Sequence, residues 1–213
     1  MMLEDNIRKV VPYTPGEQPQ GRVIKLNTNE CPYPPSPKVI EALRTADYER
    51  LRLYPEPGCD TFIDALSEYY VVDKKRIFAG VGSDDVLSMC FLTFFNGGKK
   101  VLFPDITYSF YDVWAKVYGI EYEEIPLRDD LTIDPGDYRR ENGGIVIANP
   151  NAPTGHAEEL CVIEDIIRAN QDSVVIVDEA YIDFGGETAL PLIDKYRNLI
   201  VGRTMSKARA LAG

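Results

Sequence analysis

Short runs of consecutive apolar residues recur along the second part of this chain, and segments with helical spacing separate them. The runs lie at residues 77–79, 101–103, 145–148, 174–177 and 199–201. The helical patterns lie at about 84–95, 108–118 and 158–169. Apolar residues in succession are typical of strands buried on both faces. The alternation predicts an α/β fold with a mostly parallel sheet and helices on both faces, and residues 121–125 are expected to add a strand nearer an edge.

The first 75 residues carry weaker patterns. A short helix is predicted over residues 3–11, and an extended run over residues 22–30 ends in a proline-rich turn. Ser36-Pro37 is typical of a helix start, because serine caps the first turn and proline suits its first position. Apolar residues between 62 and 70 follow the spacing of one helix face. We therefore expect an arm over residues 1–21 and a single domain over residues 22–213.

The composition of the chain argues against some classes of binding partner. The chain has 213 residues and a net charge of −11, and its isoelectric point is near 4.6. An acidic protein repels a phosphate backbone, so nucleic acid and anionic membrane surfaces are not expected partners. The sequence has neither an apolar run of about 20 residues nor the pattern of a signal peptide. We predict a cytoplasmic protein.

The four cysteines are far apart and form no Cys-x-x-Cys pair. A metal site is therefore not expected. Cys90 and Cys161 are interpreted as small core residues.

Two charged residues follow neighbouring apolar runs near the end of the chain. Asp178 comes directly after 174–177, and Lys207 lies just past 199–201. Ligands of parallel sheets gather at the carboxyl ends of the strands. A lysine can form an imine with the aldehyde of pyridoxal phosphate, and a carboxylate can keep its pyridine nitrogen protonated. The alternatives are a turn-capping aspartate and a solvated surface lysine.

Other strand exits carry residues that suit the same cofactor. Ser83 opens a helix after a glycine turn, where free N–H groups attract an anion or where serine is only a cap. Asp85 replaces the third glycine of a dinucleotide-binding motif. Tyr108 could stack on a planar ring, or it could pack in the core. The loop 149–155 could present asparagine amides or simply turn the chain, and Tyr181 could contact a ring oxygen or pack.

Several segments together resemble histidinol-phosphate aminotransferases, a branch of the fold-type I pyridoxal phosphate enzymes. The resemblance runs from about residue 22 to residue 213. Its motifs are L-N-T-N-E-C-P-Y (26–33), L-Y-P-E-P-G (53–58), G-S-D-D (82–85), P-D-I-T-Y (104–108), N-P-N-A-P-T-G (149–155), D-E-A-Y (178–181) and S-K-A-R-A-L-A-G (206–213).

The resemblance implies pyridoxal 5′-phosphate as the cofactor and a homodimer with shared sites. It implies that Lys207 is the imine-forming base, that Asp178 pairs with the pyridine nitrogen and that Tyr181 contacts the phenolate oxygen. The other implied cofactor contacts are Tyr108 on the ring, Ser83, Asp84, Thr204 and Ser206 at the phosphate, and Tyr54 at the cofactor of the partner subunit. Asn29 is expected to approach the substrate.

The chain departs from this family at two places. Ala152 stands where the family usually has an asparagine, which leaves Asn151 as a substitute for its hydrogen bond. The sequence also stops at Gly213, before the family's next arginine and its C-terminal small domain. We therefore expect an incomplete large domain, and we do not expect residues 1–213 alone to catalyse transamination.

The implied reaction is amino transfer between L-histidinol phosphate and 2-oxoglutarate, in histidine biosynthesis. Two rival enzyme functions remain open at this stage. They are an aromatic or broad-range aminotransferase and a pyridoxal phosphate enzyme that resembles threonine-phosphate decarboxylase. A non-catalytic module that kept the fold is an alternative from a different class.

Overall fold

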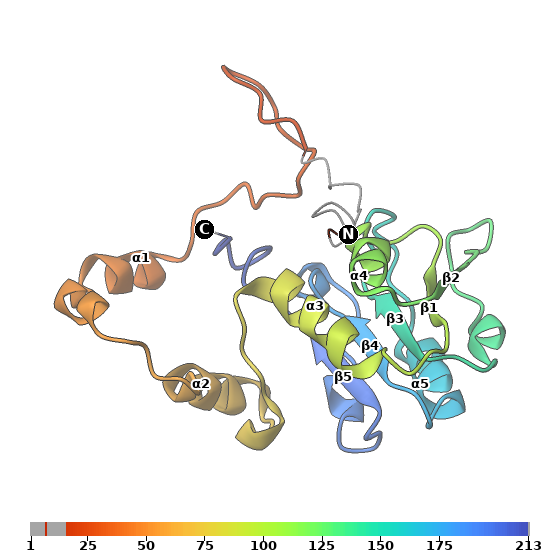
Figure 1. Ribbon diagram of the computed structural model, residues 1–213. Helices are drawn as coiled ribbons and strands as arrows, with labels where there is room; N and C mark the ends of the chain where they lie inside the picture. The colour runs from red at the N-terminus through yellow and green to blue at the C-terminus, as the bar shows by residue number, and fades with distance from the viewer. Residues whose placement is uncertain (1–6, 8–15, 213) are drawn as a thin grey trace.

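The computed structural model describes residue 7 and residues 16–212, and these fall into two parts (Figure 1). Residues 82–212, the α/β body, contain the sheet and every buried side chain among the described residues. Residues 16–81, the outer segment, carry two α-helices that project away from the sheet. The predicted helix over residues 3–11 lies almost entirely outside the described residues.

The sheet of the α/β body has five parallel strands in the order β2-β1-β3-β4-β5. The strands are β1 (Val101–Pro104), β2 (Tyr122–Ile125), β3 (Gly144–Ala148), β4 (Val175–Asp178) and β5 (Leu199–Gly202). All residues of β1, β3 and β4 are buried, as their continuous apolar runs predicted. β2 lies at an edge, as residues 121–125 indicated. The predicted α/β fold with a parallel sheet is therefore confirmed.

Two helices cover one face of the sheet, α3 (Gly82–Phe94) and α4 (Phe110–Tyr118). Phe91 of α3 packs against Tyr111 and Trp114 of α4, with ring centroids 6.4 and 5.6 Å apart. Val146 and Ile176 contribute the sheet side of this aromatic core. Burial of such large rings is a main source of stability, because each removes much apolar surface from water.

A third helix, α5 (Leu160–Ala169), covers the opposite face (Figure 1). Its residues Ile163, Ile166 and Ile167 are fully buried against β3 and β4, with Tyr138 beside them. Helices therefore cover both faces, as predicted. Within residues 16–212 the longest helix, α3, has 13 residues, and no helix could span a bilayer.

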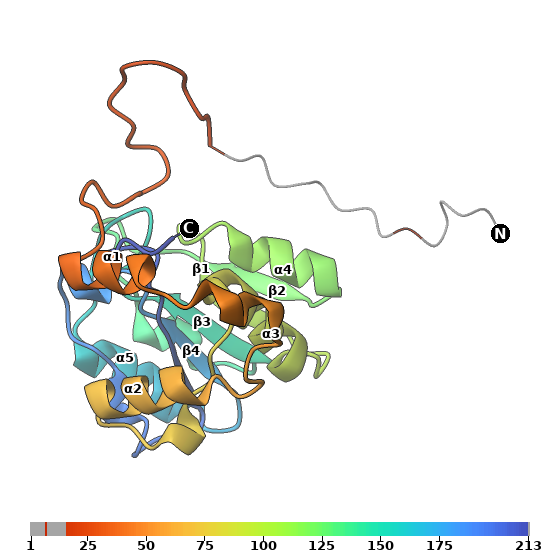
Figure 2. The same ribbon diagram turned by 90° about the vertical axis from the view of Figure 1, so that its left-hand side faces the viewer.

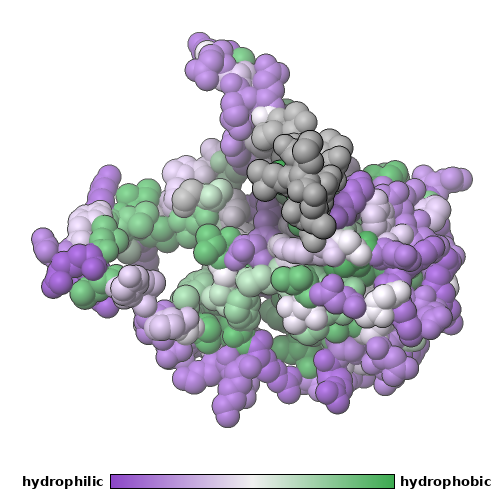
Figure 3. All heavy atoms as spheres, viewed as in Figure 1, coloured by the Kyte–Doolittle hydropathy of each residue, from purple (hydrophilic) through white to green (hydrophobic). Residues whose placement is uncertain are grey.

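The outer segment carries α1 (Pro37–Arg44) and α2 (Asp60–Tyr70). Ser36 caps α1, since its hydroxyl accepts a hydrogen bond from the Val39 amide at 3.4 Å. Neither helix has a buried residue, although both are amphipathic. Figures 2 and 3 show these helices beside the body and apolar side chains gathered along them. Their predicted helical structure is confirmed, and their apolar faces stay largely open.

Two predictions were wrong. Residues 77–79 form no strand, because they pair with no other strand of the described chain, and Phe78 is 66% exposed. An apolar run becomes a strand only where a neighbour satisfies its backbone groups. Cys161 is exposed rather than buried, because helical spacing places it on the side of α5 opposite Ile163.

Candidate active site

A cleft opens at the carboxyl ends of β3 and β4, next to the loop that follows β5. The connection after β1 runs through α4 on one face of the sheet, and the connection after β3 runs through α5 on the other. Open parallel sheets bind ligands where successive connections leave in opposite directions like this. The residues that line the cleft are Val81, Gly82, Ser83, Asp84, Tyr108, Ala148, Ala152, Asp178, Ala180, Tyr181, Ser206 and Lys207.

Asp178, the last residue of β4, places a buried carboxylate in the cleft. Successive residues of a strand point to opposite faces, so Asp178 lies on the same face as Ile176, toward α3 and α4. Asp178 as a whole is 5% exposed. The carboxylate accepts hydrogen bonds from the Tyr111 hydroxyl at 2.8 Å and from the Ala180 amide at 3.1 Å.

Burial, with smaller contributions from the carboxylates of Asp84 and Glu179, raises the pKa of Asp178 to about 6. The two hydrogen bonds lower that pKa, because they stabilise the ionised form. A buried carboxylate with a raised pKa is typical of a functional group that awaits a cation.

Tyr111 was not identified from the sequence. It is fully buried, and burial together with the charge of Asp178 raises the pKa of its hydroxyl well above 10. The hydroxyl therefore stays protonated and donates to Asp178. A signal was present, since Tyr111 follows Tyr108 by three residues, a spacing that places side chains on one side of a helical turn.

Tyr108 lies in the turn before α4 and lines the cleft. Its ring stacks on Phe110 at 5.5 Å and meets Tyr111 edge-on at 5.7 Å. The Tyr108 hydroxyl donates to the Asp84 carboxylate at 2.9 Å. Asp84 thus fixes the orientation of this ring at the cleft wall.

The N-terminus of α3 forms another part of the cleft wall. Gly82 begins the helix with φ +82°, a conformation that favours glycine. Ser83 and Asp84 occupy the first turn, where backbone N–H groups have no partner within the helix. Together with the helix dipole, these groups favour an anion.

Lys207 reaches the cleft from the loop after β5. Its ammonium lies 5.4 Å from the centroid of the Tyr181 ring. Among the described residues, no carboxylate forms an ion pair with Lys207. The Thr204 hydroxyl bonds the Ser206 hydroxyl at 3.0 Å and accepts from the Ser206 amide at 3.1 Å. The loop therefore holds two hydroxyls beside the lysine, of which Ser206 lines the cleft.

Tyr181 joins the outer segment to the cleft. Its hydroxyl accepts a hydrogen bond from the Asn29 side-chain amide at 3.0 Å. These two residues are far apart in the sequence, and both were singled out from it. Asn29 has φ +53°, a left-handed conformation that asparagine tolerates.

Four of the predicted residues do not line the cleft, and they are Asn29, Tyr54, Asn151 and Thr204. Asn151 is held in its loop, where its side chain bonds Thr107, Thr154 and the Ile106 carbonyl. Ala152, which replaces the expected asparagine, lines the cleft instead. Tyr54 is fully exposed on the outer segment.

The cleft brings together a lysine, a buried carboxylate, a tyrosine ring and a helix N-terminus. Three of the lining residues, Ala148, Ala152 and Ala180, are alanines, and their small side chains leave room for a flat ligand. The set suits a planar heteroaromatic ring that carries a carbonyl group, a basic ring nitrogen and an anionic substituent.

Comparisons with known proteins identify the family of this chain. Residues 21–213 match the family described as aminotransferase class I and II. A histidinol-phosphate aminotransferase from Marinomonas sp. is 56% identical over 211 residues, which are 98% of this chain and 60% of that protein. The enzyme of the same name from Lactococcus lactis subsp. cremoris is 52% identical over 214 residues. The chain spans about 60% of the length of these curated relatives.

Solved structures share the fold. The crystal structure of histidinol-phosphate aminotransferase from Sinorhizobium meliloti in complex with pyridoxal-5′-phosphate has a TM-score of 0.79 and 26% identity. The match covers 87% of this chain and 53% of that one. An L-threonine-O-3-phosphate decarboxylase from Porphyromonas gingivalis, with a TM-score of 0.67 and 21% identity over 82% of this chain and 54% of that one, shares the fold alone. The fold, the cleft and the match over residues 21–213 together establish that this chain belongs to the class I and II aminotransferase family.

Proposed function

We propose that the protein carrying this chain is a pyridoxal phosphate-dependent histidinol-phosphate aminotransferase. One observation carries the proposal: Lys207 and Asp178, 29 positions apart in the sequence, line the same cleft at the ends of β5 and β4. The substrate rests on the relatives, which are named histidinol-phosphate aminotransferases at 51–56% identity. The reaction is amino transfer between L-histidinol phosphate and 2-oxoglutarate, a step of histidine biosynthesis.

The residues of the cleft fit this cofactor. When bound, pyridoxal phosphate supplies an aldehyde that links to amines and a ring that withdraws electrons. Lys207 supplies the amine that would hold it. Burial raises the pKa of the Asp178 carboxyl, and a protonated pyridine nitrogen beside it would stabilise its ionised form. Ser83 and Ser206, which both line the cleft, would hold the phosphate.

Asp84 suits a different role from its predicted one. A carboxylate repels a phosphate, and the Asp84 carboxylate already accepts from Tyr108. We assign its backbone N–H at the start of α3 to the phosphate and its side chain to the orientation of Tyr108. The ring of Tyr108 would then lie against the cofactor.

Lys207 performs the proton transfer in this proposal. Its Nζ would take the proton that leaves the substrate α-carbon and release it again later in the transfer. Asp178 would keep the pyridine nitrogen protonated while negative charge develops on the ring. The Tyr181 hydroxyl would donate to the phenolate oxygen, and Asn29, bonded to Tyr181, would approach the substrate.

The outer segment supports a homodimer. α1 and α2 bury no residue, and large apolar side chains on this segment are exposed, among them Leu43, Leu51, Leu53 and Phe62. Such surfaces mark interfaces between chains. Tyr54 would then extend to the cofactor of the partner subunit. The cytoplasmic location remains a prediction.

Borohydride reduction tests the cofactor assignment. Reduction of the protein with pyridoxal phosphate bound, followed by peptide mapping, should place the cofactor on Lys207. Recovery on Lys116 or Lys195 would overturn the assignment. Histidinol phosphate, phenylalanine and threonine phosphate, assayed side by side, should give the highest kcat/KM for histidinol phosphate, and carbon dioxide release from threonine phosphate would contradict the proposal.

A further inference from the structure

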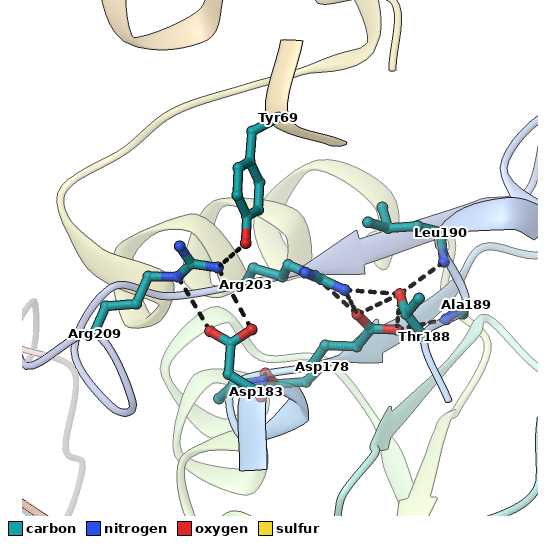
Figure 4. Close-up of polar contacts among 10 residues, drawn as sticks. Tyr69, Asp178, Asp183, Thr188, Ala189, Leu190, Arg203 and Arg209 are labelled. Atoms are coloured by element: carbon teal, nitrogen blue, oxygen red, sulfur yellow. Dashed lines mark hydrogen bonds and ion pairs between the residues drawn. The ribbon is translucent and has the colours of Figure 1, made fainter. Parts of the chain in front are cut away.

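The loop that carries Lys207 is tied at both ends to the segment that follows β4. Arg203 lies four residues before Lys207, and its Nε and Nη2 donate to one Glu179 oxygen at 2.9 and 2.7 Å. Arg209 lies two residues after Lys207, and its Nε donates to Asp183 at 3.1 Å. Figure 4 shows the Arg209 contact with Asp183 and the position of Arg203.

The first tie follows from the register of the sheet. Asp178 of β4 pairs with Gly202 of β5, and the Glu179 amide continues the ladder by donating to the Gly202 carbonyl at 2.8 Å. Glu179 and Arg203 are therefore neighbours one step beyond the strands. Because side chains alternate, Glu179 lies on the face opposite Asp178, where it bonds Thr188.

The Glu179 carboxylate is fully satisfied there. Its side chain is 1% exposed, and it also accepts from the Ala189 amide at 2.6 Å. Thr188 bonds both Glu179 and Arg203. A buried carboxylate with this many partners holds one position, so Arg203 at the start of the lysine loop is fixed as well.

Both arginines also stack on the end of α2. The Arg203 guanidinium carbon lies 4.7 Å from the Tyr70 ring centroid, and that of Arg209 lies 5.1 Å from the Tyr69 centroid. The two tyrosine rings meet edge-on at 4.8 Å. Neighbouring residues of one helix thus cover both ties from outside.

Between the ties, the loop places Lys207 over the ring of Tyr181, 5.4 Å from its centroid. Tyr181 lies between Glu179 and Asp183 in the sequence, and Asp178 is next to Glu179. We propose that Arg203 and Arg209 are positioning residues that hold Lys207 in place relative to Asp178 and Tyr181. The inference rests on the proposed function of Lys207, and it adds a link between α2 and the lysine loop.

The test uses Arg209→Met, which keeps an unbranched apolar side chain and removes the charge and the forked donors. Arg168→Met is the matched control, because Arg168 forms a similar pair with Asp165 on the outside of α5. In the cofactor-free protein, hydrogen exchange over residues 204–211 should become several-fold faster in Arg209→Met only. Unchanged exchange there would overturn the proposal whatever the cofactor does.

With the cofactor bound, Arg209→Met should lower kcat about tenfold with little change in KM. It should also move the midpoint of the pH titration of the cofactor absorbance, and Arg209→Lys should restore part of both. A fall in melting temperature with a native titration and native kcat would show a structural role and overturn the proposal. Failure of borohydride to label Lys207 in the unmodified protein would instead overturn the proposed function.

Arg203 needs a paired variant, because Arg203→Met alone leaves Glu179 buried without its cation and can prevent folding. The double variant Arg203→Met/Glu179→Gln removes both charges. It should fold and show the same loop exchange and titration shift as Arg209→Met. A folded double variant with native titration would overturn the role of this tie.

Discussion

The α/β body and the outer segment are built from the same kinds of residue and differ in what covers them. In the body, all residues of β1, β3 and β4 are buried, and large side chains such as Phe91 and Tyr111 are fully buried. In the outer segment, no described residue is buried, although α2 has a clear apolar face. Amphipathic spacing therefore determines that a helix forms, and it leaves open which chain covers the helix.

The candidate site also draws residues from both regions. The body supplies Lys207, Asp178 and Tyr108, whereas the outer segment supplies Asn29 and the pair Tyr69 and Tyr70. If the proposed function is right, substitutions in the body should affect chemistry and folding within one chain. Substitutions in the outer segment should act through contacts with other elements or with a second chain.

The largest effect is expected at Asp178. Asp178→Ala should lower kcat by about 1000-fold while some cofactor still binds, because the lost interaction strengthens as negative charge develops on the ring. Steady-state kinetics with histidinol phosphate and a spectroscopic cofactor titration measure both quantities. A nearly native kcat would show that Asp178 is only a turn cap at the end of β4.

Substitution of one phenylalanine in each region tests the comparison through the free energy of unfolding. Phe91→Ala in α3 should lower the free energy of unfolding by about 3–5 kcal/mol, since it opens a cavity among buried rings. Phe62→Ala in α2 is the matched substitution at a side chain that is 44% exposed, and it should cost less than about 1 kcal/mol in dilute protein. Denaturant unfolding at several protein concentrations separates the two.

A cost for Phe62→Ala that grows with protein concentration would show that a second chain covers α2. Equal costs for both substitutions at every concentration would contradict the division into a packed body and an open outer segment.

The sequence predicted the body better than the outer segment. The runs at 145–148 and 174–177 became buried strands because neighbours on both sides complete their hydrogen bonds. The run at 77–79 has similar composition and lacks such a neighbour, so pattern alone could not decide its state. Lys207 and Asp178 were predicted to lie at the ends of neighbouring strands, because the ends of apolar runs can be read from the sequence, and both line the cleft. Tyr111 and Glu179 were missed, because their partners depend on which face each residue takes.

The pH dependence of stability sharpens the description of Asp178. In the cofactor-free protein its pKa is about 6, whereas the ordinary value is 3.8. Between these values the folded state binds more protons than the unfolded state, so stability falls as pH rises from about 4 to 6. By neutral pH the free energy of unfolding has fallen by an amount on the order of 3 kcal/mol.

In Asp178→Asn the side-chain amide cannot ionise, and its oxygen can still accept a hydrogen bond from the Tyr111 hydroxyl. This variant should therefore match the unmodified protein below pH 4 and exceed its stability at pH 8. Asp194→Asn, on an exposed side chain, is the control and should follow the unmodified protein. Urea unfolding across this pH range measures the difference, and parallel curves for Asp178→Asn and the unmodified protein would refute the burial argument.

The smallest expected effect concerns Tyr54, the outer-segment residue proposed to complete the site of a partner subunit. Tyr54→Phe should weaken cofactor binding about tenfold, because a hydrogen bond to an anionic group is lost. Tyr48→Phe is the control, since the Tyr48 hydroxyl donates to the Leu43 carbonyl of its own chain. A mixture of Tyr54→Phe with Lys207→Ala subunits should regain native affinity at some sites, because one site of each hybrid dimer then has both an intact lysine and an intact tyrosine. If Tyr54 acted within its own chain, no mixture would regain that affinity, and the outer segment would serve the body to which it is joined.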